Sequence, residues 1–252
     1  MTTPAAAAPP SEHPAATDPT MNGNARAAGF LYLFTFVLSI PALVLIGPVL
    51  HDAGYLTGPG HDVRVTWGCL LDVVNAFAAV GTAVALFPLV KRQNESLALG
   101  FVTSRMMEAA VIMIGVVSLL AVVTLRQDHA GLAGDTTSLT TTGQALVDVR
   151  DRTFLLGPGL MPAVNALLLG TLLYRSRLVP RIIPIIGLVG APLLLASALA
   201  TLFGLSDQVS AVSGILTVPV AAWELALGLW LAVKGVDPAA VAALTDPRRG
   251  CP

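Results

Sequence analysis

The sequence is short of charged residues and of cysteine. Only 12% of its 252 residues are charged, with 14 Lys and Arg against 15 Asp and Glu. A soluble domain typically carries about 25% charged residues, so an ordinary water-soluble domain is excluded. The near-zero net charge and the lack of a basic patch give no sign of nucleic-acid binding. The two cysteines, Cys69 and Cys251, do not make a disulfide framework.

Sequence motifs of catalysis are also missing. The chain has no H-E-x-x-H, no G-x-S-x-G and no Walker A sequence, so zinc proteases, α/β-hydrolases and ATP-driven pump subunits lack their usual marks. We therefore expect no cofactor, and an enzyme is the least favoured class. His51-Asp52 and His61-Asp62 offer oxygen and nitrogen atoms that can bind a metal. A polar loop explains these pairs more simply, and we predict no metal site.

Long apolar runs are what the chain has instead. Hydrophobic residues make up 55% of it, and a membrane-spanning helix needs about 20 consecutive apolar residues. The runs that reach this length lie near residues 27–50, 66–90, 97–125, 153–174, 182–205 and 211–234. The sequence predicts an all-α polytopic bundle of six transmembrane helices over residues 26–236, surrounded by the lipid bilayer. Residues 1–25 are rich in Ala, Pro and Thr and are predicted to be a disordered tail, and residues 237–252 form a C-terminal tail.

The distribution of basic residues predicts the orientation. If the N-terminus is cytoplasmic, nine of the 14 Lys and Arg residues fall in cytoplasmic segments and four in outer loops. Cytoplasmic loops of membrane proteins carry the excess of these residues, so both termini are predicted to be cytoplasmic. Tyr32, Tyr174 and Trp230 fall near inner ends of the runs and Trp67 near an outer end, as expected of aromatic side chains at the membrane surface.

Charged residues inside the apolar runs are the main functional signal. Asp72, Glu108, Glu224 and Arg105 each lie within a predicted span, where a charge costs about 2.5–3.5 kcal/mol on insertion scales. At a rise of about 1.5 Å per residue, Arg105, Glu108 and Glu224 share a depth. Arg105 and Glu108 also share a helix face because they are three residues apart. Asp72 is predicted to lie nearer the outer surface.

Charge counting favours a site that binds protons. One arginine offsets one carboxylate, which is expected to leave two acids without a cationic partner, and buried carboxylates of that kind tend to be protonated. Two amides add hydrogen-bonding groups, since Asn75 lies one turn from Asp72 and Asn165 lies within the fourth run. The predicted intramembrane polar site comprises Arg105, Glu108, Glu224, Asp72, Asn75 and Asn165.

The prolines suggest breaks in two of the spans. Pro41 and Pro48 are predicted to interrupt the first span, and the sequence GPGLMP at residues 157–162 the fourth. Dividing the chain into two halves of three spans places a broken helix first in each half. This arrangement is typical of inverted repeats with a transport site at the midplane. Against it, prolines also occur in the fifth and sixth spans.

The segment between the third and fourth spans is the longest outer loop, residues 126–152. Thr142 is predicted to cap a helix that begins before the membrane. Asp148 and Arg152, four residues apart, are predicted to pair on its surface.

Four segments carry a resemblance to a known family. They are ARAAGFLYL at residues 25–33, SRMMEA at 104–109, LLYRSRLVPRIIPIIGLVG at 172–190 and ELALGLWLAVKG at 224–235. With these segments the chain resembles the bacterial multi-pass membrane proteins of the uncharacterised family DUF4386. The resemblance implies a six-helix protein of the bacterial plasma membrane in which Arg105, Glu108 and Glu224 are recurring features. It brings no activity, substrate or cofactor.

Two functions stay open at this point. The first is a small carrier that couples a small molecule or ion to a proton or cation through the buried arginine and glutamates. The second is a structural, assembly or regulatory membrane protein whose buried charges hold its helices together. Small residues in the fifth span, such as Gly187 and Gly190, allow close packing within one bundle or between subunits in an oligomer.

Overall fold

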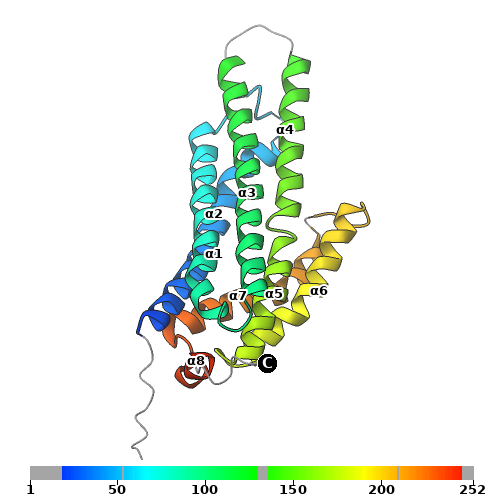
Figure 1. The fold of residues 1–252 in the computed structure, drawn as a ribbon. Helices are drawn as coiled ribbons and strands as arrows, with labels where there is room; N and C mark the ends of the chain where they lie inside the picture. The colour runs from blue at the N-terminus through cyan, green and yellow to red at the C-terminus, as the bar shows by residue number, and fades with distance from the viewer. Residues whose placement is uncertain (1–18, 53, 59, 130–135, 209, 246–252) are drawn as a thin grey trace, which may run out of the picture.

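The computed structural model of the chain describes residues 19–52, 54–58, 60–129, 136–208 and 210–245, and these form helices and connecting turns without a strand (Figure 1). The helices are α1 (Pro19–His51), α2 (Asp62–Val90), α3 (Glu95–His129), α4 (Thr136–Leu156), α5 (Met161–Ser176), α6 (Ile182–Leu202), α7 (Ala211–Val233) and α8 (Pro238–Thr245). The predicted all-α fold is confirmed.

Six stretches of helix are long and apolar enough to cross a membrane, and α4 with α5 makes up one of them. The prediction of six spans is therefore confirmed. Many large apolar side chains point away from the bundle, among them Phe77 and Ile215, which are each 70% exposed. In a bilayer such side chains contact lipid, which is as apolar as they are. The chain is a multi-pass membrane protein.

The helices extend further than their apolar runs. Residues 19–25 belong to α1, so this part of the predicted disordered tail is helical, while residues 1–18 lie outside the described chain. Part of the predicted C-terminal tail forms α8, and residues 246–252 again lie outside the description. Helix α3 has 35 residues and is about 52 Å long. It exceeds the roughly 30 Å of the hydrocarbon core, and α3 and the neighbouring α4 project past the other helices at the end of the bundle away from α8 (Figure 1).

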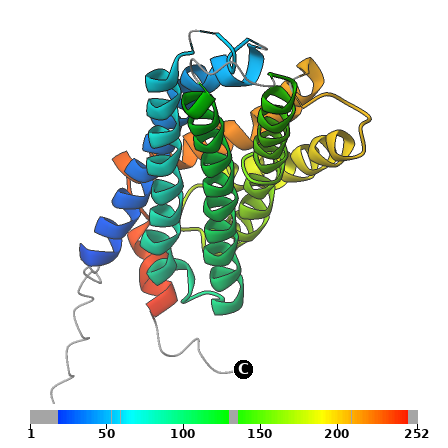
Figure 2. The same cartoon turned by 90° about the horizontal axis from the view of Figure 1, so that it is seen from above.

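The spans are arranged as a closed ring. Helix α1 packs against α2 and α7, α3 packs against α2, α4 and α5, and α6 packs against α5 and α7 (Figures 1 and 2). Helices α1 and α7 approach closely at Gly29, where a Cβ would collide with the backbone of α7 at Gly228 and Ala232. The backbone N–H of Val236 donates to Asn22 Oδ1 over 3.4 Å. The start of α1 and the end of α7 therefore lie on one face of the protein, as an even number of spans requires; we call it the inner face.

Two hydrophobic clusters fill the bundle, one above the other. The inner cluster is built around Trp223 and Phe101, and the outer cluster around Ile46 and Leu119. Arg105 lies on α3 between Phe101 and Leu119 and is only 4% exposed. The buried charges of α3 thus occupy the layer between the two clusters.

The fourth span is broken and the first is not. Helix α4 ends at Leu156 and α5 begins at Met161, as the GPGLMP sequence predicts. Helix α1 is continuous through Pro41 and Pro48, so the predicted interruption of the first span is wrong. The pattern of one broken helix at the start of each half, which favoured inverted repeats, is therefore not present.

Local composition explains this difference between α1 and the fourth span. A single proline is tolerated in membrane helices because neighbouring groups satisfy the freed carbonyls. At residues 157–159 the proline stands between two glycines, each of which disfavours a helix by roughly 1 kcal/mol relative to alanine. A Cβ at Gly159 would also collide with the carbonyl oxygen of Leu155, so the tight turn needs this glycine.

The predicted cap and ion pair of the outer loop are both wrong. Because α4 begins at Thr136, Thr142 lies inside the helix and does not cap it. Asp148 accepts a hydrogen bond from Gln144 Nε2 over 3.0 Å, in place of the expected contact with Arg152. Outside residues 130–135 the outer segment is helical, in α3 up to His129 and in α4 from Thr136, so the predicted helix is present and begins earlier than Thr142.

Candidate functional site

One arginine joins two carboxylates from different helices at the centre of the bundle. Arg105 Nη1 donates to Glu108 Oε2 over 3.0 Å, and Arg105 Nη2 donates to Glu224 Oε1 over 2.9 Å. Arg105 and Glu108 are neighbours on one face of α3, and Glu224 comes from α7. The structure thus brings these three residues to one depth, as the spacing along the spans suggested.

Two further side chains complete this group. Asn165 Nδ2, on α5, donates to Glu108 Oε2 over 2.7 Å. The ring of Tyr32, on α1, lies 5.0 Å from the Arg105 guanidinium carbon, within the range of a cation–π contact. We call Tyr32, Arg105, Glu108, Asn165 and Glu224 the arginine cluster. Tyr32 is 1% exposed, so its expected place at the membrane surface is wrong.

The arginine cluster is buried but not fully satisfied. The side chain of Glu224 is 15% exposed and that of Glu108 only 7%. Arg105 Nε and Asn165 Oδ1 are buried and have no hydrogen-bond partner among the described residues. An unpaired buried polar atom costs about 1–3 kcal/mol. The cluster therefore has hydrogen-bonding capacity beyond its ionic contacts.

The charges in the cluster do not cancel. One guanidinium faces two carboxylates, which leaves one negative charge in excess when both acids are ionised. An uncompensated charge in a buried environment is costly. A single proton or monovalent cation would neutralise the group, so proton exchange or cation binding is the chemistry that this arrangement supports.

Asp72 has a cationic partner that the sequence analysis missed. Arg150 Nη2, on α4, lies 3.5 Å from Asp72 Oδ2, on α2. Arg150 lies within residues 126–152, the segment predicted to be the longest outer loop, but it is only 7% exposed. Its side chain passes Gly115 on α3, where a Cβ would come within 2.9 Å of Arg150 Cδ. The expectation that two of the three acids lack a cationic partner is wrong, because Asp72, Glu108 and Glu224 each contact an arginine.

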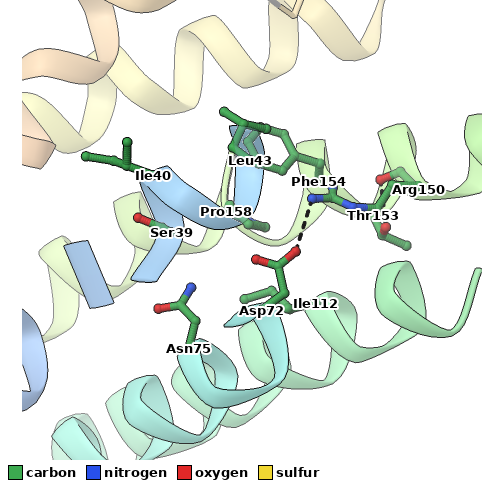
Figure 3. Close-up of a pocket in the computed structure, with 10 residues that line it drawn as sticks. All are labelled: Ser39, Ile40, Leu43, Asp72, Asn75, Ile112, Arg150, Thr153, Phe154 and Pro158. Atoms are coloured by element: carbon green, nitrogen blue, oxygen red, sulfur yellow. Dashed lines mark hydrogen bonds and ion pairs between the residues drawn. The ribbon is translucent and has the colours of Figure 1, made fainter. Parts of the chain in front are cut away.

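The Asp72–Arg150 pair lines a cavity of about 250 Å³. Figure 3 shows Asp72 and Asn75 of α2 on one side and Arg150 of α4 on the other, with Ile40 and Leu43 of α1 across the cavity. Asn75 Oδ1 is buried and has no hydrogen-bond partner among the described residues. The cavity thus combines a charged pair and a free amide with apolar walls.

The cavity and the arginine cluster lie on the same face of α3. Ile112 lines the cavity, and Glu108 lies one turn earlier, which is about 6 Å along the helix axis. Both residues are buried. Pro158, in the break between α4 and α5, also lines the cavity, and Asn165 of the cluster lies on the helix that follows this break.

The first outer loop is held by an ion pair. Arg126 Nη1, on α3, donates to Asp62 Oδ2 over 2.7 Å, and Tyr55 Oη donates to Asp62 Oδ1 over 2.9 Å. Burial, together with the hydrogen bond to Asp62, raises the pKa of the Tyr55 phenol above its ordinary value. Because Asp62 is occupied by these contacts, it serves the loop structure. Nowhere in the described chain do three or more metal-binding side chains gather.

The comparisons with known proteins identify the family and no activity. Neither a curated protein nor a solved structure matches the chain. The model of a domain of unknown function, DUF4386, matches residues 27–235. This range contains Arg105, Glu108, Glu224 and the Asp72–Arg150 pair. It covers all six spans apart from the first residues of α1, and the chain belongs to the DUF4386 family.

Proposed function

We propose that the chain is a small secondary carrier of the bacterial plasma membrane, with both termini in the cytoplasm, and that protons or cations bind at the arginine cluster. The observation that carries this proposal is the bridge from Arg105 to acids on two different helices, with one negative charge in excess. Intramembrane ionisable residues typically mark ion paths and proton relays.

Protonation would act on the contact between α3 and α7. Glu224 is more exposed than Glu108, and Glu108 also accepts a hydrogen bond from Asn165. Glu224 therefore has the better access from outside the cluster and fewer hydrogen-bond donors, and it is the acid that we propose exchanges the proton. A neutral Glu224 interacts more weakly with Arg105, since the attraction between the two opposite charges is lost. Proton binding would thus loosen α7 from α3, which links occupancy of the cluster to helix movement.

Proton flux in liposomes tests this proposal. The purified chain is reconstituted with a pH-sensitive dye in the lumen, and candidate solutes are added outside. We expect solute-dependent proton movement in the parent and none in Glu224→Gln, which keeps the shape of the side chain but cannot ionise. Glu95→Gln is the matched control, because Glu95 lies in the exposed first turn of α3 and its loss leaves the cluster intact.

The alternative is a non-transporting membrane protein whose cluster locks the helices. The direct contacts of Arg105 with α3 and α7, and of Asn165 with Glu108, favour this reading. The non-transporting alternative requires that the parent show no solute- or pH-dependent flux in liposomes. It also requires that Glu224→Gln lower the thermal stability of the protein in detergent. That pair of results would overturn the carrier proposal.

A further inference from the structure

The charged pair in the cavity is loosely joined. Arg150 and Asp72 meet in one contact of 3.5 Å, whereas charge-assisted hydrogen bonds are usually about 2.7–2.9 Å long. The arginine cluster has contacts of 2.9 and 3.0 Å. A guanidinium has five N–H donors and a carboxylate about four acceptor positions. Most of the binding capacity of both groups is therefore left for a ligand in the cavity.

Asn75 adds an unused amide beside Asp72. It lies one helical turn along α2 on the same face, and its Oδ1 is buried without a partner among the described residues. Figure 3 places its side chain next to the Asp72 carboxylate at the cavity wall. Asp72 thus presents carboxylate oxygens beside the Asn75 amide, whose rotation by 180° brings either its oxygen or its nitrogen toward Asp72, while Arg150 presents donors from the opposite side.

The remaining walls are apolar and limit the ligand in size. They are formed by Ile40, Leu43, Ile112, Phe154 and Pro158. At about 250 Å³ the cavity is smaller than the roughly 300–1,000 Å³ of pockets for drug-sized ligands. It fits a small molecule that has an apolar group next to its polar end.

The formal charge of the cavity selects among such ligands. One guanidinium and one carboxylate sum to zero, so a ligand with a single charge would leave one buried charge without a partner, which is costly. A zwitterion supplies an anionic group for the guanidinium and a cationic group for the carboxylate. Arginine is suited to planar or tetrahedral oxyanions, and carboxylate and amide oxygens accept from an ammonium group.

We infer that the cavity binds a small zwitterion with an apolar group, whose oxyanion contacts Arg150 and whose ammonium contacts Asp72 and Asn75. Two sources share this chemistry: a free amino acid, and the ethanolamine phosphate headgroup of a lipid. A headgroup would enter beside Ile40 of α1, which lines the cavity and is 65% exposed. The ligand is the carrier's cargo if the proposed function holds. Binding needs neither a gradient nor the arginine cluster, so it can succeed or fail independently of proton coupling.

Thermal unfolding of the purified chain in a non-ionic detergent tests the inference, because a ligand bound only by the folded state raises its apparent stability. The probes are leucine, 3-methylbutylamine, 4-methylpentanoate, lysophosphatidylethanolamine and lysophosphatidylcholine. We expect a rise in Tm with leucine or with lysophosphatidylethanolamine, and the one that acts identifies the source. The two single-charge analogues of leucine should have no effect. Lysophosphatidylcholine should have none either, since its quaternary ammonium has no N–H to donate.

Variants of the cavity separate binding from folding. Asn75→Ala should have the Tm of the parent without ligand, because Asn75 Oδ1 has no partner to lose. It should need at least about tenfold more ligand for half of the Tm shift, as expected for one lost hydrogen bond to a charged group. The double variant Asp72→Asn with Arg150→Gln removes both charges together and should lose the response.

Thr103→Ala is the control, because Thr103 is exposed on α3 and bonds only to the carbonyl of its own helix at Leu99. It should respond to the probes as the parent does. The inference is overturned if no probe raises the Tm. It is also overturned if the single-charge analogues act as well as leucine, or if the double variant responds as the parent does.

Discussion

Arg105 is the residue on which the centre of the bundle depends. Its replacement by methionine would leave Glu108 and Glu224 buried close together without a cation. Breaking a buried pair by removing one partner costs about 3–5 kcal/mol. We expect Arg105→Met to lower the free energy of unfolding by about this amount, measured by thermal or denaturant unfolding in detergent.

A triple variant shows whether charge is the cause. Arg105→Met combined with Glu108→Gln and Glu224→Gln removes the unpaired carboxylates while keeping the volume of the side chains. It should regain most of the lost stability, since neutral replacements of buried ion pairs are often tolerated. Equal stability of Arg105→Met and the parent would contradict the ionic role of this residue.

Tyr55 makes the stability of the protein depend on pH in the alkaline range. Its pKa is raised above the ordinary 10.0 by burial and by the hydrogen bond to Asp62. The folded state therefore holds the phenolic proton more tightly than the unfolded state. The resulting stabilisation is fully present below pH 10 and is lost as the pH rises above that value. The decrease in Tm above pH 10 should be smaller in Tyr55→Phe than in the parent, although the variant is less stable at neutral pH. Identical decreases would show that Tyr55 does not contribute.

The charged residues within the apolar runs could be predicted from the sequence, whereas Arg150, the partner of Asp72, could not. Arg105, Glu108 and Glu224 stand out as charges in apolar runs, and counting residues along their helices gives a common depth. Arg150 lies in the polar segment DVRDR, where hydropathy gives no sign of burial. Its contact with Asp72 depends on the rotation of α4 and on the space at Gly115. A single sequence does not determine helix rotation. The only sequence signal for such a partner was that a buried Asp72 needs a cation nearby.

At the scale of helices, the contact between α1 and α7 closes the ring. Gly29 allows it, because a Cβ there would collide with the backbone of α7, which cannot move aside as a flexible side chain can. We expect Gly29→Ala to destabilise the protein by about 1–3 kcal/mol, as overpacking of a well-packed contact does. Unfolding in detergent measures the effect.

Gly47→Ala is the matched control for this variant. It lies in the same helix and has nothing within 4 Å of the position of a Cβ. Alanine in an open helical position should be neutral or stabilising by about 0.5–1 kcal/mol. If both variants changed stability equally, close packing at Gly29 would not be the reason.

The positions of the helices could be predicted where the local amino-acid composition alone determines them. Spans of about 20 apolar residues are recognisable because the bilayer requires them, and the Gly-Pro-Gly sequence marks the break after Leu156. The ends of α3 and α4 were not predictable, because polar residues beyond the membrane can continue a helix when it packs on a neighbour. The interruption predicted at Pro41 and Pro48 is wrong for a related reason, since contacts with neighbouring helices keep α1 continuous.

At the scale of the whole molecule, the orientation in the membrane stays a prediction that reporter fusions can test. The ends of α1 and α7 share one face, and the basic residues predict that this face is cytoplasmic. Green fluorescent protein fused to the C-terminus should fluoresce, and alkaline phosphatase fused there should be inactive. Alkaline phosphatase fused between α1 and α2 should be active. The opposite pattern would reverse the orientation.

The break between α4 and α5 connects the two polar sites. Arg150 lies on α4 shortly before the break and Asn165 on α5 shortly after it, so one span carries a residue that lines the cavity and a contact of the arginine cluster. A few residues at the ends of helices can absorb the backbone changes of a hinge. A bend at residues 157–160 would change the angle between α4 and α5. Occupancy of the cavity at Arg150 would then alter the contact between Asn165 and Glu108.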